Sequence, residues 1–134
     1  MKFDDKYLVR FAFTPVQVVK NLNNAEKALN IAKTDRILDV KFNYAYSGLL
    51  KAGIALLSYN QIKVKSAPGH HIKIIEILAD ELKDETIADI GNAMRSKRNI
   101  DMYAGGVEVS EKECLEYIDF VSKIISQVKA LIKH

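Results

Sequence analysis

The sequence contains a single cysteine, Cys114, and only two prolines, Pro15 and Pro68, in 134 residues. One cysteine cannot form an internal disulfide, so a hydrophobic core rather than a covalent cross-link must stabilise the fold. We predict that Cys114 is a small buried hydrophobic residue on a helix; a role as nucleophile has only weak support. The scarcity of proline leaves long segments in which helices can form without interruption.

The sequence also lacks any run of about eighteen apolar residues, so we predict no membrane span. Its beginning does not resemble a secretory signal, because acidic residues follow Lys2 and Arg10 interrupts the apolar run. Together with the lone cysteine, this indicates a cytoplasmic protein. The net charge of +3 permits nucleic-acid binding but does not argue for it.

Apolar residues make up 49% of the chain, which is enough for a core within one domain covering residues 1–134. They recur at helical spacing in five segments. The predicted helices cover residues 15–33, 35–63, 70–82, 84–105 and 110–132. The second has a wide apolar face built partly of alanine and glycine, which is typical of a central helix that its neighbours approach closely.

Local signals set the predicted helix boundaries. Thr14 with Gln17, and Ser110 with Glu113, form two capping boxes, and Asp35 is a candidate N-cap for the second helix. Residues 66–69 form a break, and Gly105-Gly106 ends the fourth helix. Residues 1–13 form either a short helix or an ordered extension packed on the bundle. Since the connections are short, we predict an all-α, antiparallel up-down bundle of four to five helices.

The apolar stripes also predict which side chains face the core. In the first helix these are Val16, Val19, Leu22, Ala25, Leu29 and Ala32; in the third, Ile72, Ile75, Leu78 and Leu82; in the last, Leu115, Ile118, Val121, Ile125, Val128 and Ile132.

The fourth helix departs from this pattern, because its inward stripe of Ile87, Ile90 and Met94 continues to Arg98. A guanidinium on a core stripe requires a partner or an aqueous cleft. Arg98 therefore either pairs with a carboxylate of another helix, such as Asp39, or lines a polar cavity and binds an anion.

The neighbours of Arg98 favour the second alternative. Arg95 and Lys97 add positive charge, Asn99 adds a neutral donor, and Tyr103 adds a hydroxyl or a ring on which a base can stack. Arginine matches phosphate well, because its planar fork donates two parallel hydrogen bonds. The competing interpretation is a solvated basic face near a helix C-terminus, which the spacing alone favours.

No metal or cofactor site is predicted. His70 and His71 are adjacent on a helix and point about 100° apart, so they do not easily share one metal ion. No carboxylate or thiol at helical spacing completes a zinc site. We expect one histidine to be packed and the other solvated at the start of the third helix.

Several motifs resemble the HEPN domain family (higher eukaryotes and prokaryotes nucleotide-binding), over about residues 14–132. Residues 42–52 are similar to its core helix of aromatic and small residues, and Gly69-His70-His71 is similar to a glycine-histidine pair of several prokaryotic members. Lys97-Arg98-Asn99 followed by Tyr103 resembles the family's arginine, polar residue, spacer and histidine signature.

The resemblance implies a helical bundle that dimerises with its two signatures facing one another in a cleft. Many members resemble metal-independent endoribonucleases used as toxins or in defence, and many work beside a small nucleotidyltransferase. Arg98 would stabilise charge on the scissile phosphate, Asn99 would orient it, and Tyr103 would assist the 2′-hydroxyl.

Tyr103 stands where the family has its catalytic histidine. A tyrosine, with a pKa near 10, is a poorer base than histidine, near 6.5. The sequence therefore leaves three hypotheses open. The protein is an endoribonuclease, a non-catalytic module that binds nucleotide or RNA or pairs with a nucleotidyltransferase, or a scaffold in which Arg98 is structural. The resemblance also implies that a tyrosine near the motif, such as Tyr103, accepts a nucleotide from the partner.

Overall fold

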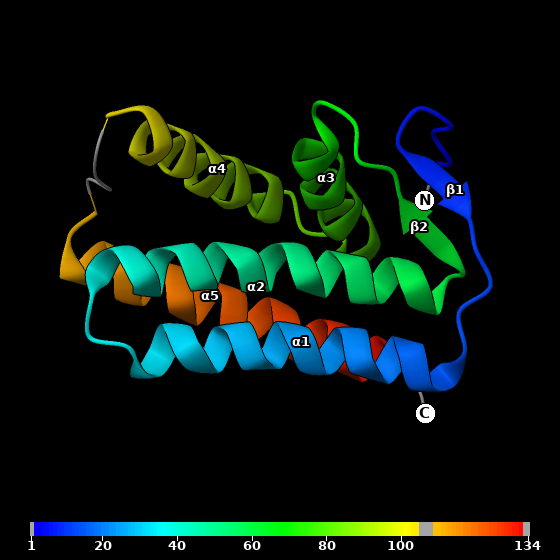
Figure 1. The fold of residues 1–134 in the computed structure, drawn as a ribbon, viewed down its shortest axis with the longest axis horizontal. Coiled ribbons are helices and arrows are strands. Elements are labelled where there is room, and N and C mark those ends of the chain that lie inside the picture. The colour runs from blue at the N-terminus through cyan, green and yellow to red at the C-terminus, as the bar shows by residue number, and fades with distance from the viewer. Residues whose placement is uncertain (1, 105–108, 133–134) are drawn as a thin grey trace.

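A computed structural model describes residues 2–104 and 109–132, and for residues 100–104 it describes the backbone alone. The described helices are α1 (Pro15–Thr34), α2 (Leu38–Tyr59), α3 (His70–Leu82), α4 (Thr86–Ala104) and α5 (Glu111–Leu131), and the described strands are β1 (Leu8–Arg10) and β2 (Ile62–Val64). The chain thus folds as the predicted helical bundle, with a small two-stranded ribbon beside it (Figure 1).

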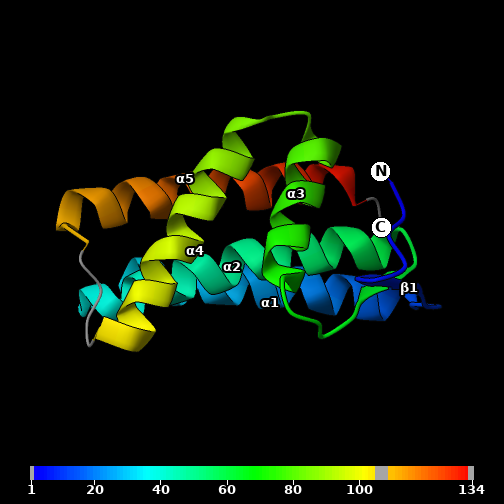
Figure 2. The ribbon, with the colours of Figure 1, turned by 90° about the horizontal axis from the view of Figure 1, so that it is seen from above.

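The helix α2 is the centre of the fold, as its small-residue face predicted. It contacts α1 and α5 on one side and α3 and α4 on the other (Figures 1 and 2). A Cβ atom built at Gly53 of α2 would overlap Cγ2 of Ile74, and one at Gly91 of α4 would lie 2.8 Å from Cγ2 of Ile75. The absence of a side chain at these two glycines therefore sets how closely α3 approaches α2 and α4.

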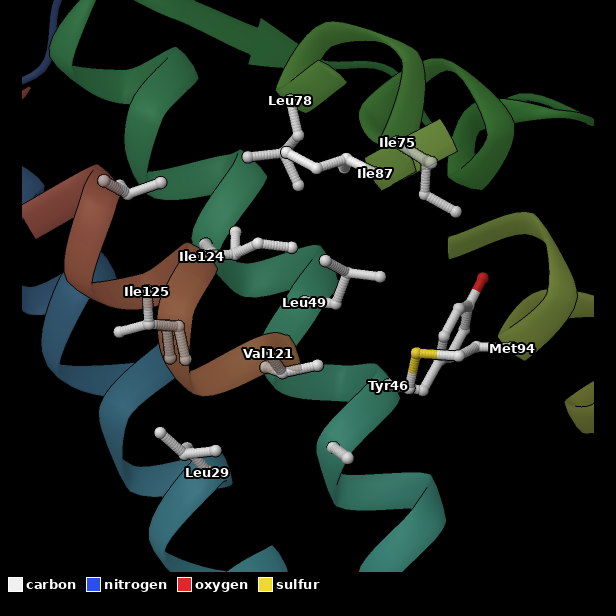
Figure 3. Packing of buried hydrophobic residues seen from close by; sticks show 14 of the residues in the cluster. Leu29, Tyr46, Leu49, Ile75, Leu78, Ile87, Met94, Val121, Ile124 and Ile125 are labelled. Carbon is white, nitrogen blue, oxygen red and sulfur yellow. The ribbon is translucent and has the colours of Figure 1, made fainter. Parts of the chain in front are cut away.

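Buried side chains from all five described helices meet in one core around α2 (Figure 3). They include Tyr46 and Leu49 of α2, Ile75 and Leu78 of α3, Ile87 and Met94 of α4, and Val121, Ile124 and Ile125 of α5. Burial of this apolar surface is the main force that stabilises the bundle. Within the described residues, none of the helices has both the length and the apolar composition that a membrane crossing requires.

Both predicted capping boxes are confirmed. The Gln17 backbone N–H donates to Thr14 Oγ1 over 3.2 Å, and Gln17 Oε1 accepts from the Thr14 backbone N–H. Ser110 and Glu113 make the same reciprocal pair at the start of α5. These bonds satisfy backbone donors that a helix N-terminus would otherwise leave unpaired, so they fix where α1 and α5 begin.

The predicted limits of the second helix were wrong at both ends. Asp35 caps the end of α1, its carboxylate accepts from the Ile37 backbone N–H over 2.9 Å, and α2 begins only at Leu38. The helix ends at Tyr59 rather than near Lys63, because Gln61 adopts a left-handed backbone conformation with φ of 61°.

The chain then enters β2, which pairs antiparallel with β1 in the register Leu8↔Val64 and Arg10↔Ile62. Buried Leu8 and Ile62 pack with Leu57 and Ile77 under the ribbon. Residues 2–13 therefore form the ordered extension and not the short helix, although the sequence had not predicted that the extension contains a strand.

Three side chains predicted to face the core are exposed. Val16 is 77% exposed, Leu115 53% and Ile72 40%, and Val18, Cys114 and Ile74 are buried in their places. Spacings of three and four residues both fit a helical stripe, so the pattern alone does not fix its phase at a helix end. Burial of Cys114 confirms the prediction made for that residue.

Candidate anion-binding site

The antiparallel packing of α3 and α4 builds the candidate site. Lys83 ends α3 in a left-handed conformation with φ of 53°, and α4 begins at Thr86 and runs back beside α3. The first turn of α3 therefore lies beside the second half of α4 (Figure 2). This turn carries His70 and His71.

Three helices each contribute one side chain to the centre of the site. The Tyr46 hydroxyl of α2 lies 3.2 Å from Nδ1 of His71 of α3. The guanidinium of Arg98 of α4 lies over the Tyr46 ring, 5.7 Å from its centroid. The face of an aromatic ring attracts a cation, so Tyr46 holds Arg98 in place without neutralising it.

Burial determines the ionisation state of Tyr46 and His71, the two uncharged side chains at the centre of the site. It raises the pKa of Tyr46 to about 12, although the positive charges of Arg98 and Arg95 oppose that rise. Burial also lowers the pKa of His71, and the neighbouring His70, Arg98 and Arg95 lower it further. Near neutral pH the site therefore contains a neutral phenol, a neutral imidazole and two cationic guanidinium groups.

Arg95 leaves a hydrogen-bond donor unused. Its Nε atom is buried and has no hydrogen-bond partner among the described residues, and the same holds for Oδ1 of Asn92 one turn earlier. A buried N–H without an acceptor is unfavourable by about 1–3 kcal/mol, and more where the group is charged. An acceptor supplied by a bound anion would remove that penalty.

Two hollows meet at His71. The first is lined by Ser66, Ala67, Pro68, Gly69, His70, His71, Ile72, Arg95 and Asn99. The second is lined by Asn43, Tyr44, Tyr46, Ser47, Leu50, Lys51, His71 and Arg98. Each hollow therefore receives one arginine of α4, and the imidazole of His71 stands between them.

The predicted site residues do not all come together. Arg98 is half-buried, four residues after fully buried Met94, and no carboxylate among the side chains that the structure describes forms an ion pair with it. The alternative partner Asp39 is exposed. Lys97 instead forms an ion pair outside the two hollows, with its Nζ atom 3.4 Å from Oε2 of Glu113 of α5. The Tyr103 side chain lies outside the described residues.

His71 and Tyr46 are the two central site residues that sequence reasoning missed. The prediction of one packed and one solvated histidine was wrong, because both are half-buried. His70 Nδ1 lies 2.8 Å from the Ala67 carbonyl, and the two rings are 4.4 Å apart. In the described part of the chain, no group of three histidine, cysteine or acidic side chains is placed to hold a metal ion.

Fold and site together define an all-α bundle with a cationic, partly aromatic hollow at the junction of α2, α3 and α4. A protein from Sulfurovum sp. (strain NBC37-1) named "Nucleotide-binding protein" is 23% identical over 126 residues. The alignment covers 91% of this chain and 74% of that relative. No family profile and no solved structure matches the chain. The chain is thus distantly similar to a protein of that name.

Proposed function

We propose that the hollows at His71 bind the phosphate of a nucleotide or of an RNA chain. The observation that carries this proposal is the pair of guanidinium groups, Arg95 and Arg98, on either side of a neutral imidazole. Among the side chains that the structure describes, no carboxylate pairs with Arg98, and the Nε donor of Arg95 has no acceptor. Two such groups match the oxygens of a phosphate in charge and geometry.

The other lining groups suit a nucleoside better than a bare anion. Asn43, Ser47 and Asn99 offer neutral donors and acceptors, and the Tyr44 ring is 39% exposed beside them. Aromatic rings and amides are the groups that stack on bases and bind their edges. The name of the distant Sulfurovum relative and the HEPN resemblance support the same class of ligand.

Isothermal titration with AMP and ATP tests the proposal. Removal of one charged donor should weaken binding by roughly ten- to a hundredfold, so we expect that loss for Arg98→Ala and for Arg95→Ala. Arg36→Ala is the matched control, because Arg36 is an exposed arginine between α1 and α2. If the wild-type protein binds neither nucleotide, or if all three variants bind equally, the proposal is wrong.

A second candidate function is metal-independent RNA cleavage, and the position of His71 favours it. This imidazole is neutral near pH 7 and stands between the two arginines, so it can replace the histidine of the family signature, whose place Tyr103 takes in this chain. The RNA 2′-oxygen would attack the adjacent phosphorus as His71 takes its proton. The bond to the 5′-oxygen would break, and that oxygen would gain a proton from solvent.

Incubation of RNA with the protein in EDTA tests cleavage. We expect 2′,3′-cyclic phosphate ends, and we expect their formation to stop in His71→Ala but to continue in His70→Ala. Equal cleavage by both variants would exclude His71 as the base. Absence of product at high protein concentration would leave the binding module as the function.

The resemblance adds two partners to the proposal, a second copy of the chain and a small nucleotidyltransferase. A dimer would bring two α4 helices, and so two Tyr103 residues, to one cleft. Sedimentation analysis tests the dimer directly, and a monomer at all accessible concentrations would argue against it. Incubation with a small nucleotidyltransferase and labelled ATP tests whether Tyr103 accepts a nucleotide, with Tyr103→Phe as the control.

A further inference from the structure

The ribbon has an outer face that combines aromatic and basic side chains. Side chains alternate along a strand, so burial of Leu8 and Ile62 turns their neighbours outward. We define the ribbon face as Val9, Phe11, Lys63 and Lys65. Phe11 is 43% exposed and Val9 40%, and both lysines are exposed. The ribbon face thus presents partly exposed apolar and aromatic side chains beside exposed lysines.

Cations lie over the rings of this region. Lys63 Nζ is 5.2 Å from the centroid of the Phe11 ring. Tyr7 has Lys6 and Lys73 at 5.2 and 5.8 Å, and the Arg10 guanidinium is 4.8 Å from the Phe3 ring. Lysine side chains thus lie over the Phe11 and Tyr7 rings, so a positive charge stands beside each of these two rings.

One neighbouring carboxylate, that of Asp4, is already engaged. Asp4 pairs with Lys73 over 3.3 Å and accepts from the Lys6 backbone N–H. Lys65 Nζ donates to the Asp5 backbone carbonyl over 2.6 Å. Among the described residues, no carboxylate forms an ion pair with Lys63 or Lys65, so the outer face stays positive.

The ribbon adjoins the first hollow through Tyr7, the residue before β1. A Cβ atom at Gly69 would lie 3.2 Å from the Tyr7 hydroxyl, so Tyr7 lies against the loop that precedes α3. Gly69 also lines the hollow with Arg95 and Asn99. Both views show the start of α3 between α4 and the ribbon (Figures 1 and 2). A chain molecule in that hollow can therefore continue onto the ribbon.

We propose that the ribbon face binds single-stranded nucleic acid and extends the phosphate site at His71. Lysines follow the phosphates of a single strand while exposed rings stack on its bases, and this combination is typical of surfaces that bind single strands. A duplex offers no open base face to Phe11. This inference rests on the proposed function, because one phosphate of the strand would occupy the Arg95–Arg98 site.

The test compares a mononucleotide with a labelled single-stranded RNA of roughly ten nucleotides. We expect the wild-type protein to bind the oligonucleotide more tightly than AMP. The double variant Phe11→Ala/Lys63→Ala should weaken oligonucleotide binding by about tenfold and leave AMP binding unchanged. Arg98→Ala should weaken the binding of both ligands.

The double variant Lys33→Ala/Ile37→Ala is the matched control. It removes one exposed lysine and one exposed apolar side chain where α1 ends, far from the ribbon. Salt dependence gives a second readout. Each lysine that contacts a phosphate contributes about 0.7 to the slope of log affinity against log salt concentration, so Lys63→Ala/Lys65→Ala should reduce that slope by about 1.4.

The outcomes separate this inference from the proposed function. If AMP binds and the oligonucleotide binds no more tightly, the ribbon inference fails and the phosphate site remains. If neither ligand binds, both fail. If Phe11→Ala lowers the melting temperature through its contact with Phe13, Lys63→Glu replaces it, because that side chain is exposed. Unchanged oligonucleotide affinity in Lys63→Glu would overturn the inference.

Discussion

The Tyr46 hydroxyl lies 3.2 Å from Nδ1 of His71, so a side chain in the centre of the core fixes a ring in the candidate site. Tyr46 is 1% exposed and packs among the helices of the bundle. Because the same ring lies under the guanidinium of Arg98, one residue of α2 determines where groups of both α3 and α4 stand.

Removal of the Tyr46 hydroxyl should destabilise the fold modestly. Tyr46→Phe keeps the buried ring but deletes one hydrogen bond, and we expect a loss of about 1 kcal/mol in the free energy of unfolding. Urea denaturation measures it. Tyr44→Phe, at an exposed tyrosine of the same helix, should change that free energy by less than about 0.5 kcal/mol. If Tyr44→Phe lost more free energy of unfolding than Tyr46→Phe, the buried Tyr46 hydroxyl would not be the one that stabilises the fold.

The stability should depend on pH through His71. Its pKa in the folded protein is lowered, so the unfolded chain binds the proton more tightly. The stabilising contribution of neutral His71 is complete above the ordinary value of about 6.5. It is lost as the pH falls below that value and through the lower pKa of the folded state.

Urea midpoints at about pH 7.5 and pH 5 measure this dependence. We expect the midpoint of the wild-type protein to fall more between these pH values than that of His71→Asn, whose amide does not titrate. Parallel pH profiles for the two proteins would show that His71 does not carry the effect.

Two glycines of α2 should respond differently to alanine. In Gly53→Ala the new methyl group would overlap Ile74, so we expect destabilisation of about 1–3 kcal/mol. In Gly48→Ala the new Cβ atom would lie 3.4 Å from its nearest neighbour, Cγ1 of Val121. The higher helix propensity of alanine offsets part of any strain. Thermal melting of both variants gives the comparison, and equal melting temperatures would contradict it.

Cys114 should be unreactive in the folded protein. It is buried, and burial raises the pKa of its thiol, so both access and thiolate formation are disfavoured. We expect a thiol reagent to label it roughly a hundredfold more slowly, or slower still, in buffer than in denaturant. Labelling at similar rates in both conditions would mean that the start of α5 opens readily.

The helices were predictable from the sequence because local rules determine them. The capping residues Thr14 and Ser110 fixed two helix starts, and apolar periodicity identified all five described helices. The unusual position of Arg98 after Met94 was also visible, since helical phase alone places a residue relative to its stripe.

The parts of the fold and the site that the sequence did not predict depend on contacts between segments far apart in the chain. The strand β1 forms because residue 8 meets residue 64, and no local pattern in residues 1–13 specifies that partner. His71 belongs to the site because Tyr46 and two arginines of α4 surround it. On its own helix it looked like an ordinary residue of the first turn, and only the resemblance of Gly69-His70-His71 to a family motif hinted at a role.

The pairing of β1 with β2 also has a consequence for folding. It closes a loop that contains the whole of α1 and α2, whereas contacts within each helix join residues that are close in the chain. Loop closure of this length is entropically unfavourable until the enclosed helices have docked. We therefore expect the amides of the ribbon to be among the last to gain protection during refolding and among the first to exchange with solvent deuterium.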